Sequence, residues 1–410
     1  ALMHSELVDR HRWVEEPQFL HALNFCHLLP GPEAQQLATY IGWRLHGARG
    51  GFAAGLLFLL PGVAVILALS VLYAYAAGLG WFAALFLGIK AAVLAVVLQA
   101  LVRIAGRALD TPIKRALAVL AFVALFFFDL PFPLVVLASG LAGLLVASWR
   151  PGLLHLPGDP ALPDRAPRPA IGATARTIAG WALIWAAPLL LAWAALGRDH
   201  VLIDIGLFFS QLALVSFGGA YAVLAYMAQE AVQGFGWLNA GEMVDGLGMA
   251  ETTPGPLILV TQFVGFIAAY RDAAPFAPLV AGLLGALLTV WVTFAPCFLW
   301  IFTFAPWIDR LQHARRLKGA LAAVTAAVVG VIANLSLWFA LHVIFGDVAE
   351  LRFGPLRVYW PDIATLDGLA LALALLSGVM LMVLRRSVVE VLALSAMVAL
   401  VSHLAAEVFI

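Results

Sequence analysis

Two Pro-Gly-Pro tripeptides interrupt the apolar sequence of this chain, at residues 30–32 and 254–256. Proline cannot continue a helix but suits the first turn of a new one, so each tripeptide predicts a broken helix. The N–H groups at the start of each half-helix lack intrahelical partners, and the helix dipole makes that end positive. The chemistry expected at Gly31 and Gly255 is therefore the binding of an anion. The alternative is that each tripeptide only kinks a structural helix.

Polar side chains beside the two breaks supply donors or a proton. Glu33 and Glu251 are carboxylates next to the breaks, and both are candidates for coupling or gating. For Glu33, stabilisation of the first helical turn by a negative charge is an equally good interpretation. The predicted substrate-binding residues are Gly31, Pro32, Glu33, Gln36, Tyr40, Lys90, Gly218, Gly219, Tyr221, Thr252, Thr253 and Gly255.

Lys90 is a cation inside an apolar run. At ~1.5 Å per residue it lies ~13 Å into its predicted span, near the middle of a bilayer. A lysine at that depth costs several kcal/mol unless it is paired or hydrated, so it predicts a functional role on an anion path. Snorkelling towards the interface is the alternative. His21, His27 and Asp245 are weaker candidates, and interhelical hydrogen bonding explains Gln35, Gln99 and Gln262.

The composition determines which elements must position these residues. The chain is 64% hydrophobic and only 11% charged, whereas soluble domains carry roughly a quarter charged residues. Several apolar runs exceed the ~20 residues that span a bilayer. This predicts an all-α polytopic membrane protein. The net charge of zero gives no reason to expect a nucleic-acid partner. Enzyme motifs, metal-ligand clusters and a phosphate loop are absent from the sequence, so we expect a transporter without a cofactor rather than an enzyme.

An internal repeat predicts the architecture. Aligning the two Pro-Gly-Pro motifs pairs Pro30 with Pro254, and the same offset pairs Glu6 with Glu230 and Trp13 with Trp237. Further along the chain the offset becomes slightly longer, and it then pairs Pro61 with Pro296. Matches at fixed offsets indicate a duplication. The first offset also predicts one more helix before residue 1, carrying a Phe-Gly-Gly like that at 217–219.

The duplication divides the chain into two membrane repeats. The predicted units are a first repeat at 1–148, a Pro/Arg-rich cytoplasmic linker at 149–176, an unpaired span at 177–196 and a second repeat at 202–410. About twelve spans are expected in this chain, plus the preceding helix. If each broken element crosses once, the halves are inverted, and sixteen basic residues lie inside against six outside. Re-entrant hairpins would change the sides of several loops.

Specific motifs resemble a known family. Residues 28–43 and 45–51, with Ser216–Tyr221 and Glu251–Pro256 in the second half, closely resemble the chromate ion transporter family in its long two-domain form. The resemblance implies export of chromate across the inner membrane of a bacterium, with sulfate as a competitor. A homodimer is compatible with it. Uptake or exchange of sulfate or another oxyanion is the alternative, and a membrane sensor or scaffold is a third hypothesis.

Overall fold

The computed structural model describes residues 2–156, 170–217, 220–253, 255–308 and 314–409, and these are mostly helical. Seven of the described helices are long and apolar enough to cross a membrane. The prediction of a polytopic helical membrane protein is confirmed. These helices are α3 (Glu33–Ala76), α4 (Gly80–Ala108), α6 (Phe132–Trp149), α7 (Ile171–Leu196), α12 (Pro278–Phe304), α14 (Arg315–Ile344) and α16 (Val388–Phe409).

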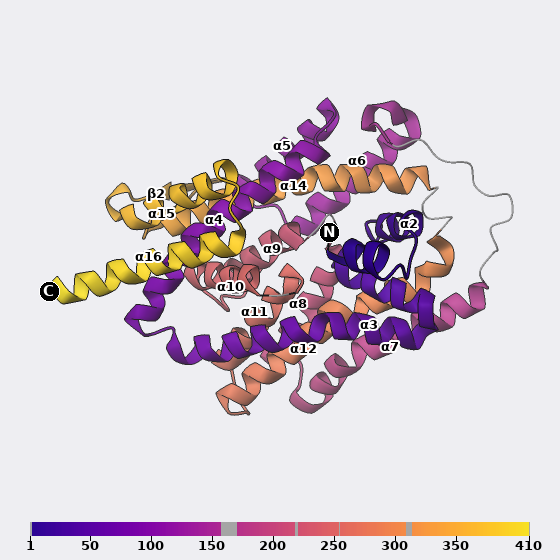
Figure 1. Cartoon of the computed structure of the whole chain (residues 1–410), viewed down its shortest axis with the longest axis horizontal. Coiled ribbons are helices and arrows are strands. Elements are labelled where there is room, and N and C mark those ends of the chain that lie inside the picture. The colour runs from indigo at the N-terminus through magenta and orange to yellow at the C-terminus, as the bar shows by residue number, and fades with distance from the viewer. Residues whose placement is uncertain (1, 157–169, 218–219, 254, 309–313, 410) are drawn as a thin grey trace.

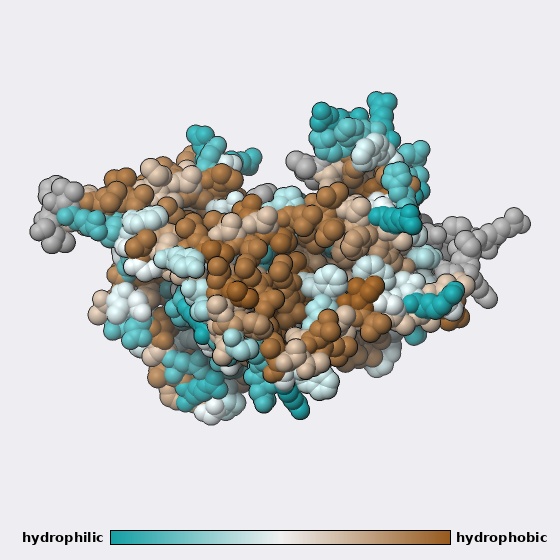
Figure 2. Space-filling model, turned by 90° about the horizontal axis from the view of Figure 1, so that it is seen from below, coloured by the Kyte–Doolittle hydropathy of each residue, from teal (hydrophilic) through white to brown (hydrophobic). Residues whose placement is uncertain are grey.

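Hydrophobic side chains cover the middle of the molecule. In the face drawn in Figure 2 they form a broad central area, and hydrophilic residues lie around its margin. The large side chains that are fully buried include Phe263 and Phe266 of α11 (Val260–Arg271) and Phe339 of α14. A broad apolar surface with polar residues at its margin suits a bilayer.

The helix α3 contains a sharp reversal at residues 46–47. His46 and Gly47 have non-helical backbone angles, and Gly47 has a φ of +65°. A Cβ built on Gly42 would lie 2.5 Å from the carbonyl oxygen of Gly50, so the segments on either side of the turn pack backbone to backbone. Residues 33–45 therefore run antiparallel to residues 48–76, and only the second segment crosses the molecule.

Residues 33–45 form a re-entrant hairpin with α2 (Glu16–Cys26). The rings of Phe25 and Tyr40 lie 5.7 Å apart, one on each arm, and the Pro-Gly-Pro break is at the tip. A second hairpin pairs α10 (Ala240–Thr252) with α11 (Val260–Arg271) around the other break. Arg271, at the end of α11, donates to the carbonyl of Trp237 at 2.8 Å and to Glu242, at the start of α10, at 3.0 Å. Both arms therefore end on the same side.

The first segment of the second repeat, over residues 202–231, is also a hairpin. It consists of α8 (Val201–Val215) and α9 (Ala220–Gln229), with Ser216 outside both helices. Gln211 donates to the hydroxyl of Tyr226 across the two arms at 3.1 Å. The assumption that each broken element crosses once is therefore wrong. Arms of 10 to 15 residues reach only part-way through a ~30 Å hydrocarbon core.

Re-entrance moves two arginines to the other end of the molecule. Val14 packs with Ala305 and Ile308, where α12 ends beside the linker, so Arg10 and Arg12 lie at this linker end. The opposite end, which we call the strand end, holds four of the described basic residues. These are Arg198, Arg271, Arg352 and Arg357. With Arg10 and Arg12 moved to the linker end, the predicted positive-inside bias is larger than the sequence count of sixteen to six.

A β-hairpin at the strand end was missed from the sequence. Strands β1 (Val348–Phe353) and β2 (Leu356–Pro361) pair antiparallel, with Arg352 opposite Arg357. They lie beside α15 (Gly368–Gly378), at the left of Figure 1, near the C-terminus. Long helices such as α3 and α14 run from this end towards α6 and α7 at the right. The helix α5 (Pro112–Phe126) packs against α14.

The backbone repeats itself at the offset predicted from the two Pro-Gly-Pro motifs. The N–H of His11 donates to Glu6 at 3.0 Å, and that of Phe235 donates to Glu230 at 2.7 Å. The bond from Trp13 to Leu7 likewise recurs in the second half, from Trp237 to Ala231. Both sets belong to single π-helical turns, Ser5–Arg10 and Glu230–Gly234. The positive φ of Arg12 recurs at Gly236.

Candidate functional site

The tip of the first hairpin is held by its backbone. Gly31 has a φ of +117°, and its N–H donates to the carbonyl of Ser216 at 2.9 Å. Gln36 closes the tip by donating to the carbonyl of Pro30 at 2.6 Å. Pro32 is the N-cap residue of α3. The unpaired N–H groups at the start of α3 therefore lie beside the break between α8 and α9. The predicted anion would bind to these groups.

The carboxylate of Glu33 faces a histidine on the other arm. Its Oε1 lies 2.7 Å from Nδ1 of His27, and both side chains are more than a third exposed. Glu33, which the sequence assigned either to coupling or gating or to stabilisation of the first helical turn, therefore has His27 as its partner. In the second hairpin, Glu251 instead accepts a hydrogen bond from the Tyr221 hydroxyl at 2.8 Å.

The threonines of the second tip turn back onto their own helix. Thr252 donates to the carbonyl of Met249 at 2.9 Å, and Thr253 donates to that of Ala250 at 3.2 Å. Their hydroxyl hydrogens, like that of Tyr221, are thus used within the protein. The donors that remain at this tip are backbone N–H groups at the helix start that follows Gly255, whose φ is +126°.

Each tip sits against a helix of the other half. A Cβ built on Gly31 would lie 2.8 Å from Sγ of Cys297, in α12. A Cβ built on Gly255 would lie 3.5 Å from the Cα of Gly62, in α3. Gly62 and Cys297 are paired by the second, longer offset of the repeat, and each follows a proline inside its helix. The two tips therefore occupy corresponding positions.

Buried amides surround the tips. The side chains of Gln36 and Gln262 are completely buried, and Gln262 donates to the carbonyl of Val63 at 3.1 Å, beside Gly62. Gln35 is equally buried. In each of these amides the oxygen has no hydrogen-bond partner among the described residues. A buried polar atom without a partner is costly, so packing alone does not explain why these three amides lie here.

Lys90 lies away from the tips, in an ion pair. Its Nζ is 3.1 Å from Oδ1 of Asp245, and the hydroxyl of Tyr73 donates to Oδ2 at 2.7 Å. Asp245 is 5% exposed. The stretch of α10 between Asp245 and Thr253 is about 12 Å long at the helical rise. The structure thus groups Lys90 with Tyr73 and Asp245 nearer the strand end. Sequence reasoning missed Tyr73 and gave Asp245 little weight.

The remaining predicted site residues are Tyr40, Gly218 and Gly219. Tyr40 is buried in the first hairpin, where its ring packs with those of Phe25 and Trp43. Gly218 and Gly219 lie outside the described residues. Ser216 and Cys297, which contact the first tip, were not predicted as site residues. The only signals for them were the broken motif at 216–219 and the offset that pairs Gly62 with Cys297.

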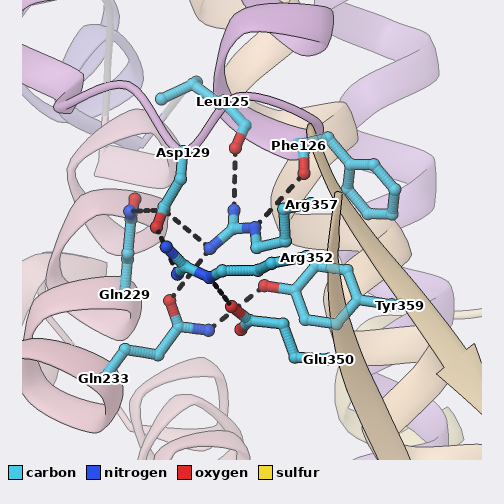
Figure 3. Close-up of polar contacts among 9 residues, drawn as sticks. All are labelled: Leu125, Phe126, Asp129, Gln229, Gln233, Glu350, Arg352, Arg357 and Tyr359. Carbon is cyan, nitrogen blue, oxygen red and sulfur yellow. Dashed lines mark hydrogen bonds and ion pairs between the residues drawn. The ribbon is translucent and has the colours of Figure 1, made fainter. Parts of the chain in front are cut away.

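A second polar cluster fastens the β-hairpin at the strand end (Figure 3). Arg357 is 3% exposed, and it pairs with Asp129 at 2.6 Å and donates to the carbonyl of Leu125 at 2.8 Å. Gln229, at the end of α9, donates to Asp129 at 2.8 Å. Burial raises the pKa of the Tyr359 hydroxyl, while its hydrogen bond with Gln233 opposes this. The cluster thereby ties α5, α9 and β2 together.

Fold and site together define a polytopic membrane protein organised around re-entrant broken helices, an arrangement used by secondary transporters. The family model described as chromate transporter matches residues 1–144 and 203–401. The chain belongs to the chromate transporter family, and it is a transporter rather than an enzyme.

Individual relatives agree with this membership. The chain is 32% identical over 336 residues to the chromate transport protein of Pseudomonas aeruginosa, covering 81% of this chain and 73% of that protein. It is 28% identical over 335 residues to a probable chromate transport protein of Synechococcus elongatus, covering 81% and 77%. It is also 28% identical over 337 residues to the chromate transport protein of Cupriavidus metallidurans, covering 80% and 74%. No solved structure matches the chain.

Proposed function

We propose that the protein exports chromate from the cytoplasm across a bacterial inner membrane. The substrate follows from the relatives, two of which are named chromate transport proteins. The direction follows from charge, because an inside-negative potential favours export of a dianion by about 2.3 kcal/mol per charge per 100 mV. The excess of basic residues at the linker end supports a cytoplasmic position for that end. The driving force is then the membrane potential itself.

The proposed anion site lies between the two hairpin tips and the break that follows α8. The observation that carries it is the bond from the Gly31 N–H to Ser216, because it places the start of α3 beside a second broken helix. A tetrahedral dianion requires several donors in a region of low dielectric constant. The helix starts after Gly31 and Gly255 supply the N–H donors.

In this proposal the two repeats are inverted relative to each other. The first hairpin opens at the linker end and the second at the strand end, and each tip contacts the other half. Lys90 and Asp245 lie on the exit side of the site. There the Lys90 ammonium attracts the departing anion. The Asp245 carboxylate keeps the anion from binding tightly to Lys90. Glu33 and Glu251 act in gating, each through its partner, His27 or Tyr221.

The test is transport in vesicles of known orientation. Inside-out vesicles, whose lumen corresponds to the outside of the cell, should accumulate chromate when the lumen is made positive. They should lose this accumulation when the potential is reversed. Failure to accumulate chromate under the favourable potential would contradict export.

The alternative is uptake or exchange of sulfate or another oxyanion at the same tips. Sulfate has the same shape and charge as chromate, and no described side chain distinguishes between them. Right-side-out vesicles that take up sulfate faster than inside-out vesicles take up chromate would favour this alternative. Competition by sulfate in the export assay would show only that the two anions share the site.

A further inference from the structure

A basic groove opens on the surface of α4, on the side where this helix continues towards the linker end. It lies between α4 and the π-helical turn Val379–Val383 that ends the α15 segment, and it has a volume of about 600 Å³. Its lining contains three arginines and no carboxylate. The lining residues are Gln99, Val102, Arg103, Leu381, Met382, Arg385, Arg386, Ser387 and Val388.

The three arginines have no acidic partner among the described residues. Arg271, Arg352 and Arg357, at the strand end, all pair with carboxylates. None of the ion pairs in the described part of the chain involves Arg103, Arg385 or Arg386. Three guanidinium groups around one hollow make a strongly positive site that fits a phosphate or similar tetrahedral anion.

The backbone around the groove is fixed. Gln99 donates to the carbonyl of Leu381 at 3.2 Å, which holds α4 against the π-helical turn. Arg386 donates its N–H to Met380 at 2.9 Å, and Arg385 has a φ of +53°. A non-glycine residue in the left-handed region is strained, and such strain persists only where the surrounding structure maintains it. Arg385 and Arg386 therefore project from a defined turn, and Arg103 lies on α4.

Exposed apolar side chains adjoin the groove on the same elements. Val102 is 61% exposed, Val383 is 70% exposed and Leu384 is 59% exposed. Apolar residues of this kind on a membrane protein face lipid chains, whereas the arginines lie at the end with the positive excess. A groove that is basic on one side and continuous with a lipid-facing surface on the other matches the shape and polarity of a phospholipid.

We propose that this groove binds the phosphate headgroup of an anionic phospholipid of the cytoplasmic leaflet, with acyl chains along Val102 and Val383. Free inorganic phosphate presents the same chemistry to the arginines, but it makes no use of the apolar flank. A zwitterionic lipid makes use of the flank, but its net charge is zero. These differences separate the possible ligands.

The experiment measures lipid binding by the purified full-length chain in detergent. Native mass spectrometry counts bound molecules of phosphatidylglycerol or phosphatidylcholine, with and without inorganic phosphate. The test variant is R103Q/R385Q/R386Q. The matched control, R107Q/R315Q/R316Q, removes the same charge at the same end from arginines that do not line the groove.

We expect phosphatidylglycerol to bind at least about tenfold more tightly than phosphatidylcholine, and the test variant to lose this preference. The control should keep it, and a test variant that elutes as the native protein does on size exclusion excludes misfolding as the cause. Equal loss in both variants, or a preference retained by the test variant, would overturn the proposal. Displacement of phosphatidylglycerol by millimolar inorganic phosphate would assign the groove to a free anion instead.

Discussion

The two broken hairpins share a backbone but differ in their polar groups. Both tips have a glycine at positive φ seated against a helix of the other half. The first carries an exposed His27–Glu33 pair and an amide that closes its own turn. The second carries a more buried acid bonded to Tyr221, and an ion pair further along α10. The backbone break is thus the common element, and the side chains give the two hairpins different polar surroundings.

The largest difference should appear at the tip glycines. In Gly31→Ala the new Cβ would lie 2.8 Å from both Cys297 Sγ and Gln36 Nε2, at a φ of +117°. Backbone strain and overpacking together cost about 4 kcal/mol, so chromate transport in vesicles should fall at least about a hundredfold. Gly255→Ala meets its nearest atom at 3.1 Å and should lose less.

Gly354→Ala is the control for this pair. Gly354 also has a positive φ, of +60°, but nothing lies within 4 Å of a Cβ built there. Its transport should stay within about twofold of the wild type, because strain alone costs about 1 kcal/mol and lies far from the tips. Normal transport by a well-expressed Gly31→Ala protein would refute the tip site.

The next effect concerns the ion pair that only the second hairpin makes with α4. Asp245→Asn leaves the part-buried Lys90 ammonium beside Tyr73 without the carboxylate that it faces. Loss of one partner from a buried pair costs about 3 kcal/mol, so the thermal midpoint should fall by several degrees. The double variant Lys90→Met/Asp245→Leu should recover most of that loss. A double variant less stable than Asp245→Asn would contradict this.

Tyr221→Phe tests the part-buried acid of the second hairpin. It removes the donor to Glu251, and the loss of one such hydrogen bond costs about 1 kcal/mol. The transport rate should fall severalfold while chromate binding changes little, because in the proposed mechanism the hydroxyl gates rather than binds. The matched control is Tyr226→Phe, because Tyr226 lies in α9 as Tyr221 does. This change removes the hydroxyl that accepts a hydrogen bond from Gln211 of α8. A purely structural role would affect the two variants equally.

The smallest effect is expected at the exposed acid of the first hairpin. His27→Gln breaks the contact with Glu33, but the two side chains are 48% and 35% exposed. A pair as accessible as this contributes about 0.5 kcal/mol, so stability should scarcely change. If the transport rate falls as far as in Tyr221→Phe, the two acids have equivalent roles, and the distinction between the hairpins fails.

The sequence predicted the features that depend on local chemistry. Proline in an apolar run located both breaks, and the pairing of Trp13 with Trp237 anticipated backbone hydrogen bonds that recur at the same offset. These results follow because proline geometry and apolar length act within a few turns of the chain.

Long-range pairing was beyond the sequence. Nothing in the run around Lys90 indicates that Asp245 neutralises it, because the two residues belong to different halves of the chain and meet only when α10 packs on α4. Re-entrance was left open for a similar reason. A broken helix has the same composition whether its second arm continues or turns back, and the bond from Arg271 to Glu242 decides the matter. The β-hairpin depends on Arg357 reaching Asp129, which no local pattern indicates.

The seating of each tip on the opposite half has a consequence for biosynthesis. Gly31 depends on Ser216 and Cys297, residues that leave the ribosome long after it, whereas Gly255 meets Gly62, which is already made. The first half therefore waits in the membrane with an unfinished tip until the second half is inserted. A chain cut within the linker should regain transport only when both fragments are co-expressed, because each completes the other.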